Sequence, residues 1–143
     1  LILMLACDYR VGSSAPCKLG LTEARVGIPF PAVAMQVLQA EVAPHVARVL
    51  TLRAENIAPQ AALACGLLDE LQPPARILSA AMARARDLAS MPAEGYARIK
   101  QQLRAGTLAR IEETIARGTD PALASWVTPE AGAASAALLR GER

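Results

Sequence analysis

The segment 27–31, Gly-Ile-Pro-Phe-Pro, constrains the fold most, because no regular helix or strand can pass through it. Each proline fixes its φ angle and lacks an N–H donor, and the glycine favours a turn. We therefore expect the chain to turn here and a new helix to begin at about residue 32. One carboxylate, Glu23, lies just before this break.

Apolar residues are the sequence neighbours of Glu23, namely Leu19, Leu21, Val26 and Ile28. An apolar setting favours the neutral form of a carboxylic acid and so prepares such a group to carry a proton. We therefore predict that Glu23 is a catalytic acid and base. The alternative is a solvated or salt-bridged surface glutamate beside Arg25, at a strand-to-helix turn.

Short strands and helices alternate early in the predicted pattern, and helices alone follow, which indicates an α/β body with a helical C-terminal extension. We place the body at residues 1–90 and the extension at 91–143. Proline at a helix start and glycine after its end delimit several of the helices, and Thr128 is a suitable N-cap for the last one. The expected helices end at residue 6 and cover 32–40, 44–52, 59–65, 74–89, 92–103, 107–117, 121–126 and 129–139; the expected strands cover 9–12, 17–19 and 67–71.

Charge and hydropathy argue against several classes of partner. The net charge is only +2 and no basic cluster stands out, so nucleic acid is not an expected partner. No apolar stretch reaches the roughly 18 residues of a membrane-spanning helix. The apolar start lacks the basic region and cleavage site of a signal peptide, so we expect a cytoplasmic protein that does not bind membranes.

The cysteines and the single histidine do not form a recognisable reactive or metal-binding motif. Cys7, Cys17 and Cys65 are odd in number and lack C-x-x-C spacing, so we expect reduced, structural thiols and no metal site. His45 follows Pro44 at a helix start with no nucleophile motif nearby, which predicts an ordinary surface residue.

Several short segments together are similar to a known family in residue type, order and spacing. They are Cys7-Asp8-Tyr9-Arg10, Gly20-Leu21-Thr22-Glu23, Gly27-Ile28, and the segments 47–50, 58–62 and 66–69. This pattern resembles the crotonase (enoyl-CoA hydratase/isomerase) superfamily, and within it the mitochondrial-type Δ3-Δ2-enoyl-CoA isomerase branch, with Thr22 in place of that branch's asparagine. The resemblance covers roughly residues 1–105.

The resemblance implies the C-terminal part of a crotonase-like ββα spiral. A crotonase domain is much longer than this chain, which begins in mid-pattern with Leu1, so we expect the N-terminal half of the fold to be missing here. In the family that half supplies both backbone N–H donors of the oxyanion hole. A chain without it is therefore expected to be inactive.

The resemblance also implies the chemistry. The substrate is a coenzyme A thioester, no other cofactor is needed, and Glu23 takes a proton from C2 and returns it to C4. Oxyanion-hole donors stabilise the enolate, each by roughly 3 kcal/mol. Hydratases of the superfamily use a second glutamate, whose position corresponds to Ile2, and this absence favours isomerisation. Ile2, Leu21, Ile28 and Phe30 are candidates to line the acyl pocket, with plain core packing as the alternative.

Other roles remain open at this point. The resemblance implies a homotrimer or a dimer of trimers. Apolar residues of the late helices are candidates for packing on the body or on a neighbouring subunit, with closure of their own core as the alternative: Leu103, Leu108, Ile111, Ile115 and Leu123. Lys100 and Arg104 either approach CoA phosphates or form a solvated face, and Asp8 is expected to make structural contacts. The alternative functions are single-glutamate hydration, thioester hydrolysis or a non-catalytic scaffold.

Overall fold

A computed structural model describes residues 1–118, 120, 123, 126 and 128–140. Helices dominate it, with two short strands and two 3₁₀ turns. In chain order the elements are α1 (Ile2–Leu5), β1 (Val11–Ser13), η1 (Glu23–Val26), α2 (Ala32–Glu41), α3 (Pro44–Thr51), α4 (Pro59–Ala64), β2 (Glu70–Gln72), η2 (Pro74–Arg76), α5 (Ile77–Ala89), α6 (Ala93–Ala116) and α7 (Pro129–Arg140).

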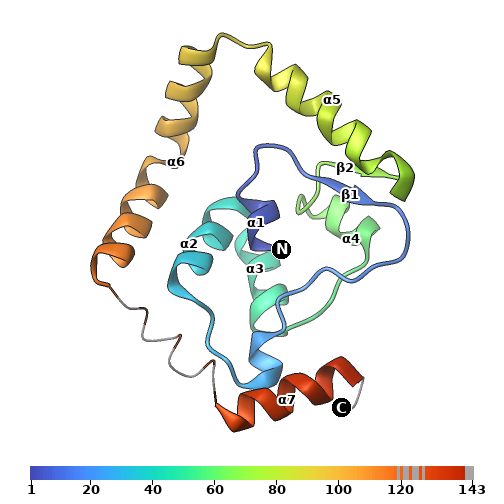
Figure 1. Ribbon diagram of the computed structural model, residues 1–143, viewed down its shortest axis with the longest axis vertical. Coiled ribbons are helices and arrows are strands. Elements are labelled where there is room, and N and C mark those ends of the chain that lie inside the picture. The colour runs from blue at the N-terminus through green and yellow to red at the C-terminus, as the bar shows by residue number, and fades with distance from the viewer. Residues whose placement is uncertain (119, 121–122, 124–125, 127, 141–143) are drawn as a thin grey trace.

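The elements form a central body framed by the later helices. Figure 1 shows α1 to α4 and the strands in the middle, α5 and α6 as a wide arch around them, and α7 on the side away from the arch. Helix α6 packs against α2, α5 against β1, and α7 against η1. The C-terminal helix therefore lies next to the turn that contains Glu23.

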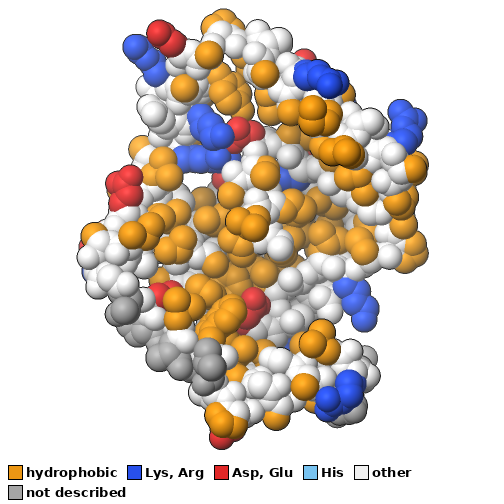
Figure 2. All heavy atoms as spheres, viewed as in Figure 1, with side chains coloured by type: hydrophobic (Ala, Val, Ile, Leu, Met, Phe, Trp, Pro, Cys, Tyr) orange, Lys and Arg blue, Asp and Glu red, His pale blue; other side chains and the backbone are white. Residues whose placement is uncertain are grey.

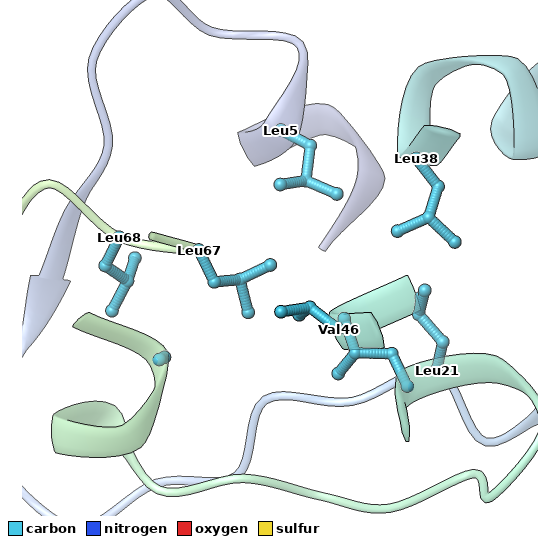
Figure 3. Packing of buried hydrophobic residues seen from close by; sticks show 8 residues of the cluster. Leu5, Leu21, Leu38, Val46, Leu67 and Leu68 are labelled. Carbon is cyan, nitrogen blue, oxygen red and sulfur yellow. The ribbon is translucent and has the colours of Figure 1, made fainter. Parts of the chain in front are cut away.

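A leucine-rich core holds the body together. Its buried members come from α1, the segment before η1, α2, α3, α4 and the chain before β2: Leu5, Leu21, Leu38, Val46, Leu50, Ala62, Leu67 and Leu68. Figure 3 shows Leu5, Leu38 and Leu67 directed toward a common centre. Burying each large aliphatic side chain contributes about 1.5–3 kcal/mol, so this cluster is the main stabilising element of the body.

The sheet has two parallel strands. Val11 pairs with Glu70 and Ser13 with Gln72, and the chain between the strands contains α2, α3 and α4. A parallel pair requires such a long crossover, which usually carries helices. This arrangement confirms the α/β pattern that the sequence predicts for the first part of the chain.

Two clusters of polar contacts are prominent among those that attach the arch to the body. On the sheet side, Glu70 accepts hydrogen bonds from the Tyr9 hydroxyl at 3.1 Å and from Arg84 Nε of α5 at 3.0 Å. At α6, the carboxylate of Asp8 forms ion pairs with Lys100 Nζ at 2.6 Å and with Arg104 Nη1 at 3.0 Å. Charged side chains therefore contribute to the attachment of the arch, beside the packing of α6 on α2.

The second attachment extends into a partly buried ion pair. Arg104 also contacts Glu41 of α2 at 3.3 Å, and Glu41 pairs with the buried guanidinium of Arg10. Arg10 in turn donates to the carbonyl oxygen of Leu5 at 3.1 Å. Because these groups share partners, the network joins α1, α2 and α6. Asp8 thus makes the structural contacts that the sequence predicts.

Two predicted helices and two predicted strands differ from the observed elements. The two helices expected at 92–103 and 107–117 are one continuous helix, α6, because the interior glycine at 106 weakens a helix without ending it. The strand expected at 17–19 is a single bridge between Leu19 and Ile57. The strand expected at 67–71 begins only at Glu70, because the backbone N–H groups of Leu67 and Leu68 donate to the carbonyl oxygen of Ala62 at the end of α4. The helix expected at 121–126 lies largely outside the described residues.

Some apolar surface remains uncovered. Figure 2 shows hydrophobic side chains across the middle of one face, where α1 and α2 lie in Figure 1. Leu3 of α1 is 88% exposed, and on α6 the exposed fraction is 82% for Leu103 and 65% for Ile115. Ile111 is half-buried. Within the described residues, Leu103 and Ile115 therefore do not close a core of their own, contrary to one of the two alternatives that the sequence left open.

Candidate active site

Glu23 is the first residue of η1, the tight turn that follows the buried Leu21. The turn ends at Gly27, whose φ of 70° is in the left-handed region that favours glycine. The backbone N–H of Ile28 then donates to the carbonyl oxygen of Glu23 at 3.0 Å. Chain-breaking residues therefore place Glu23 at a turn between the core and α2, as the sequence predicts.

The carboxylate of Glu23 has an unusual environment. Its Oε2 atom is buried and has no hydrogen-bond partner within the described part of the chain. Buried polar atoms in proteins are nearly always paired, and an unpaired one calls for an explanation. A carboxylate that must accept and release a substrate proton needs such a free oxygen.

A cavity of about 280 Å³ adjoins Glu23. It lies between η1 and α7, and most of its lining is apolar. The lining residues are Thr22, Glu23, Val26, Ile28, Trp126, Ser135, Leu138 and Leu139. Ligand cavities of this kind combine apolar walls with a few polar groups that orient the ligand. Here the polar groups are one carboxylate and two hydroxyls, from Thr22 and Ser135.

The far wall of this cavity comes from the C-terminal part of the chain. Trp126 Nε1 donates to the carbonyl oxygen of Pro29 at 2.9 Å, and Asp120 Oδ2 accepts from the backbone N–H of Ala32 at 2.6 Å. Trp126, Ser135 and Leu138 line this wall, although no sequence pattern predicts them as site residues. Trp126 is the only tryptophan of the chain, but nothing in the local pattern links it to a turn so far away.

The chain that enters η1 is held by the loop between α3 and α4. Leu19 and Ile57 exchange backbone hydrogen bonds of 3.1 and 2.8 Å. Gly20 lies so close to this loop that a Cβ atom there would overlap the Asn56 side chain and stand 3.1 Å from the Glu55 carbonyl oxygen. The chain entering η1 is therefore fixed against residues 55–57.

Of the four residues predicted for the acyl pocket, only Ile28 lines the cavity with Glu23. Leu21 is 5% exposed and belongs to the core, and Ile2 and Phe30 pack against that core. These three residues thus pack in or against the core, and their place in an acyl pocket stays a prediction. The spacing of apolar residues from Glu23 in the sequence does not reveal which side of the turn each of them faces.

The remaining candidates lie away from Glu23. His45 is exposed at the start of α3, and Lys100 and Arg104 are bound to Asp8 and Glu41. Cys7 and Cys17 are exposed thiols, and Cys65 is partly buried. Among the described residues no cluster of metal-ligating side chains occurs. None of the described helices is long and apolar enough to cross a membrane.

The charge cluster beside α6 shifts the ionisation of Asp8. Burial raises the pKa of its carboxyl, but hydrogen bonds from Lys100 and Tyr96, together with the charge of Arg104, outweigh burial and hold this pKa below its ordinary value. A carboxyl held ionised in this way is suited to binding α6 to the body and not to carrying a proton.

Comparison with known proteins identifies the family. Residues 1–121 match the family described as enoyl-CoA hydratase/isomerase. No curated protein matches the chain. Solved structures do: an enoyl-CoA hydratase, EchA3, from Mycobacterium ulcerans is 28% identical with a TM-score of 0.72, over 78% of this chain and 49% of that one.

Two further structures support the fold. An enoyl-CoA isomerase from Mycobacterium tuberculosis is 25% identical with a TM-score of 0.73, over 82% of this chain and 53% of that one. A hydratase/isomerase from Pseudoalteromonas atlantica is 18% identical with a TM-score of 0.80, over 99% of this chain and 57% of that one. The chain thus spans about half the length of these structures.

The family match covers most of the chain, and the structural matches place its α/β fold among the crotonases. The names of the related structures include both a hydratase and an isomerase, so they do not separate the two reactions. This chain belongs to the enoyl-CoA hydratase/isomerase family, within the crotonase superfamily.

Proposed function

We propose that the full-length protein is an enoyl-CoA isomerase that moves a double bond from the 3- to the 2-position of an acyl-CoA thioester. Glu23 removes a proton from C2 and returns it to C4. The observation that carries this proposal is the buried, unpartnered Oε2 of Glu23 beside an apolar cavity. A positioned carboxyl contributes on the order of 10²- to 10⁴-fold to the rate of such a proton transfer.

A single base suffices for this reaction. Among the described residues that line the cavity, Glu23 is the only carboxylate. The position that corresponds to the second glutamate of the hydratases is Ile2, on α1, and an aliphatic side chain cannot transfer a proton. The single carboxylate at the cavity, together with the position of Ile2 that the resemblance implies, favours proton transfer by one carboxylate over two-glutamate hydration.

Enolate stabilisation is the second requirement. In the crotonase fold, backbone N–H donors hold the thioester oxygen, and the resemblance places these donors in sequence that would precede Leu1. Donors of this kind are worth about 3–4 kcal/mol each. The contribution of this chain is therefore the base and the acyl side of the site, with the CoA thioester as substrate and no other cofactor.

Single-glutamate hydration is the second candidate. The hydroxyls of Thr22 and Ser135 line the same cavity as Glu23, and they are suitable partners for a water molecule. The Mycobacterium ulcerans relative also carries the name of a hydratase. Thioester hydrolysis and a non-catalytic scaffold are the remaining alternatives, and release of free CoA from the same substrates distinguishes them.

The test is turnover of trans-3-enoyl-CoA and hydration of crotonyl-CoA by the full-length protein, as wild type and as Glu23→Gln. Glu94→Gln, on the exposed start of α6, is the matched control. We expect isomerisation that falls by at least about 100-fold in Glu23→Gln and is unchanged in the control. Hydration without isomerisation would favour the second candidate. Activity that survives in Glu23→Gln would rule out Glu23 as the base.

We also propose that the full-length protein forms a homotrimer or a dimer of trimers. The support is the exposed apolar surface of α6, where Ile99 is 66% and Leu103 82% exposed. Large exposed apolar side chains clustered on one element are typical of an interaction surface. Light scattering coupled to gel filtration measures the mass, and a monomer at micromolar concentration would contradict this proposal.

A further inference from the structure

We infer that Arg25 is a positioning residue for Glu23. Its side chain ties the turn that contains the predicted base to the backbone that follows α3. This inference rests on the proposed function, because it assigns Arg25 a role in the same proton transfer. It adds a second residue to the site, one whose side chain does not line the cavity beside Glu23.

The contact is made by the guanidinium group. Arg25 Nε donates to the carbonyl oxygen of Ala54 at 2.7 Å, and its Nη2 atom lies 3.3 Å from the carbonyl oxygen of Arg53. The planar guanidinium presents several N–H donors in a fixed geometry, so one side chain holds two successive carbonyls. Hydrogen bonds from a charged donor are also stronger than those between neutral groups.

The acceptor backbone is itself held in a defined position. Ala54 is 2% exposed and has a φ of 46°, in the left-handed region that a side chain with a Cβ atom rarely adopts. Such a conformation costs on the order of 1 kcal/mol or more and persists only where its surroundings enforce it. The backbone N–H of Glu55 also donates to the carbonyl oxygen of Val49, in α3, at 3.3 Å.

Arg25 completes a two-point attachment on either side of Glu23. Before Glu23, the bridge between Leu19 and Ile57 fixes the entering chain. After Glu23, Arg25 fixes the end of the turn to Arg53 and Ala54. Both attachments use the same loop, residues 53–57, so this loop acts as a brace for the predicted base.

The carboxylate depends on this brace, together with the packing of α7 on η1, for its position. Oε2 of Glu23 has no hydrogen-bond partner among the described residues. The turn η1 has only four residues, and Thr22 makes no side-chain capping bond to it. The position of the carboxylate is therefore set by the backbone of the turn, and a displacement of about 1 Å costs on the order of 100-fold in rate at a reacting centre.

The experiment compares Arg25→Gln and Arg25→Lys with wild type in the full-length protein. Arg98→Gln, which removes the same charge from the exposed face of α6, is the matched control. Two measurements are made on each variant: kcat and KM for trans-3-enoyl-CoA, and hydrogen exchange of the backbone amides of residues 21–28. Urea unfolding of each variant identifies any general loss of stability.

For Arg25→Gln we expect kcat to fall by about 10- to 100-fold with KM changed by less than about two-fold, and exchange at residues 21–28 to rise at least about ten-fold. Arg25→Lys, which keeps one charged donor, should recover part of both effects, and it replaces Arg25→Gln if that variant does not fold. Arg98→Gln should leave both measurements unchanged.

Two results would overturn the inference: unchanged exchange at residues 21–28 in both Arg25 variants, or increased exchange with wild-type kcat. A wild-type protein without turnover of either substrate is a different outcome. It would refute the proposed function, while the exchange measurement would still show whether Arg25 holds the turn.

Discussion

The indole Nε1 of Trp126 lies 2.9 Å from the carbonyl oxygen of Pro29, a residue 97 positions earlier in the chain. This hydrogen bond joins the segment before α7 to the turn that follows Glu23. Together with the packing of α7 on η1, it makes the C-terminal part of the chain a wall of the cavity beside the predicted base. The size and access of that cavity therefore depend on α7.

Replacing Leu138 with alanine should widen the cavity on the α7 side. Leu138 lines the cavity, and a methylene group in an apolar pocket is worth about 1–3 kcal/mol of discrimination. We expect the ratio of kcat/KM for long over short 3-enoyl-CoA substrates to rise by about ten-fold. Leu78→Ala, at an exposed position of α5, is the control. An unchanged ratio would show that α7 does not bound the acyl chain.

Replacing Trp126 with phenylalanine should loosen the same wall. The variant keeps most of the apolar ring and loses the N–H donor to Pro29. A neutral hydrogen bond contributes about 1 kcal/mol net, so we expect KM for the acyl-CoA to increase by roughly five-fold. Steady-state kinetics measure this directly. The prediction fails if KM is the same as in the wild type.

Much of the body could be predicted from chain-breaking residues alone. Pro44 and Pro59 open α3 and α4 as expected, and the Thr128 hydroxyl accepts the N–H of Ala131 at 3.1 Å, which confirms the predicted N-cap of α7. These features are local, because proline geometry and capping act within one helical turn. The break between 103 and 107 was wrong because a glycine inside a helix costs only about 1 kcal/mol, which the rest of a long helix offsets.

The site was only partly predictable, because only its local features follow from the sequence. The turn after Glu23 follows from Gly27 and the two prolines, and the structure confirms it. The partners of that turn, Arg53 and Ala54 on one side and Trp126 on the other, are distant in sequence. No local pattern encodes such contacts, and they decide which apolar residues face the cavity.

Gly20 and Gly95 should respond oppositely to replacement by alanine. A Cβ atom at Gly20 would overlap the Asn56 side chain and approach the backbone of the brace, so we expect a loss of about 1–3 kcal/mol in the free energy of unfolding. Gly95 lies within α6 with open space around it, so alanine there should stabilise by about 0.5–1 kcal/mol. Urea unfolding of both variants tests the pair, and a Gly20→Ala protein as stable as wild type would contradict the close packing.

Replacement by alanine should affect stability very differently at Leu50 and Leu52, which are two positions apart. Leu50 is fully buried in α3, whereas Leu52, just after that helix, is 76% exposed. Leu50→Ala should therefore destabilise by about 2–5 kcal/mol, through lost burial and a residual cavity. Leu52→Ala should change stability by less than about 0.5 kcal/mol unless a partner covers it. Equal effects of the two substitutions would mean that the core is elsewhere.

The attachment of α6 through Asp8 should weaken in acid. The pKa of Asp8 in the folded protein lies below its ordinary value of 3.8, because the hydrogen bonds from Lys100 and Tyr96 outweigh burial. The folded state therefore binds this proton less tightly than the unfolded state does. The stabilisation is fully present above the ordinary pKa and is lost as the pH falls through the lowered one.

The substitution Asp8→Asn isolates this contribution. Lys100 is 43% exposed, so solvent screening limits the expected difference in unfolding free energy to about 1 kcal/mol or less near neutral pH. That difference should stay constant down to about pH 5 and shrink below about pH 4, because the wild-type carboxyl then becomes neutral as well. Urea unfolding across this range measures it, with the exposed Asp87→Asn variant of α5 as the control. A difference that persisted unchanged at about pH 3 would mean that Asp8 acts through its shape and not through its charge, and the ion pairs to α6 would then contribute little to holding the arch on the body.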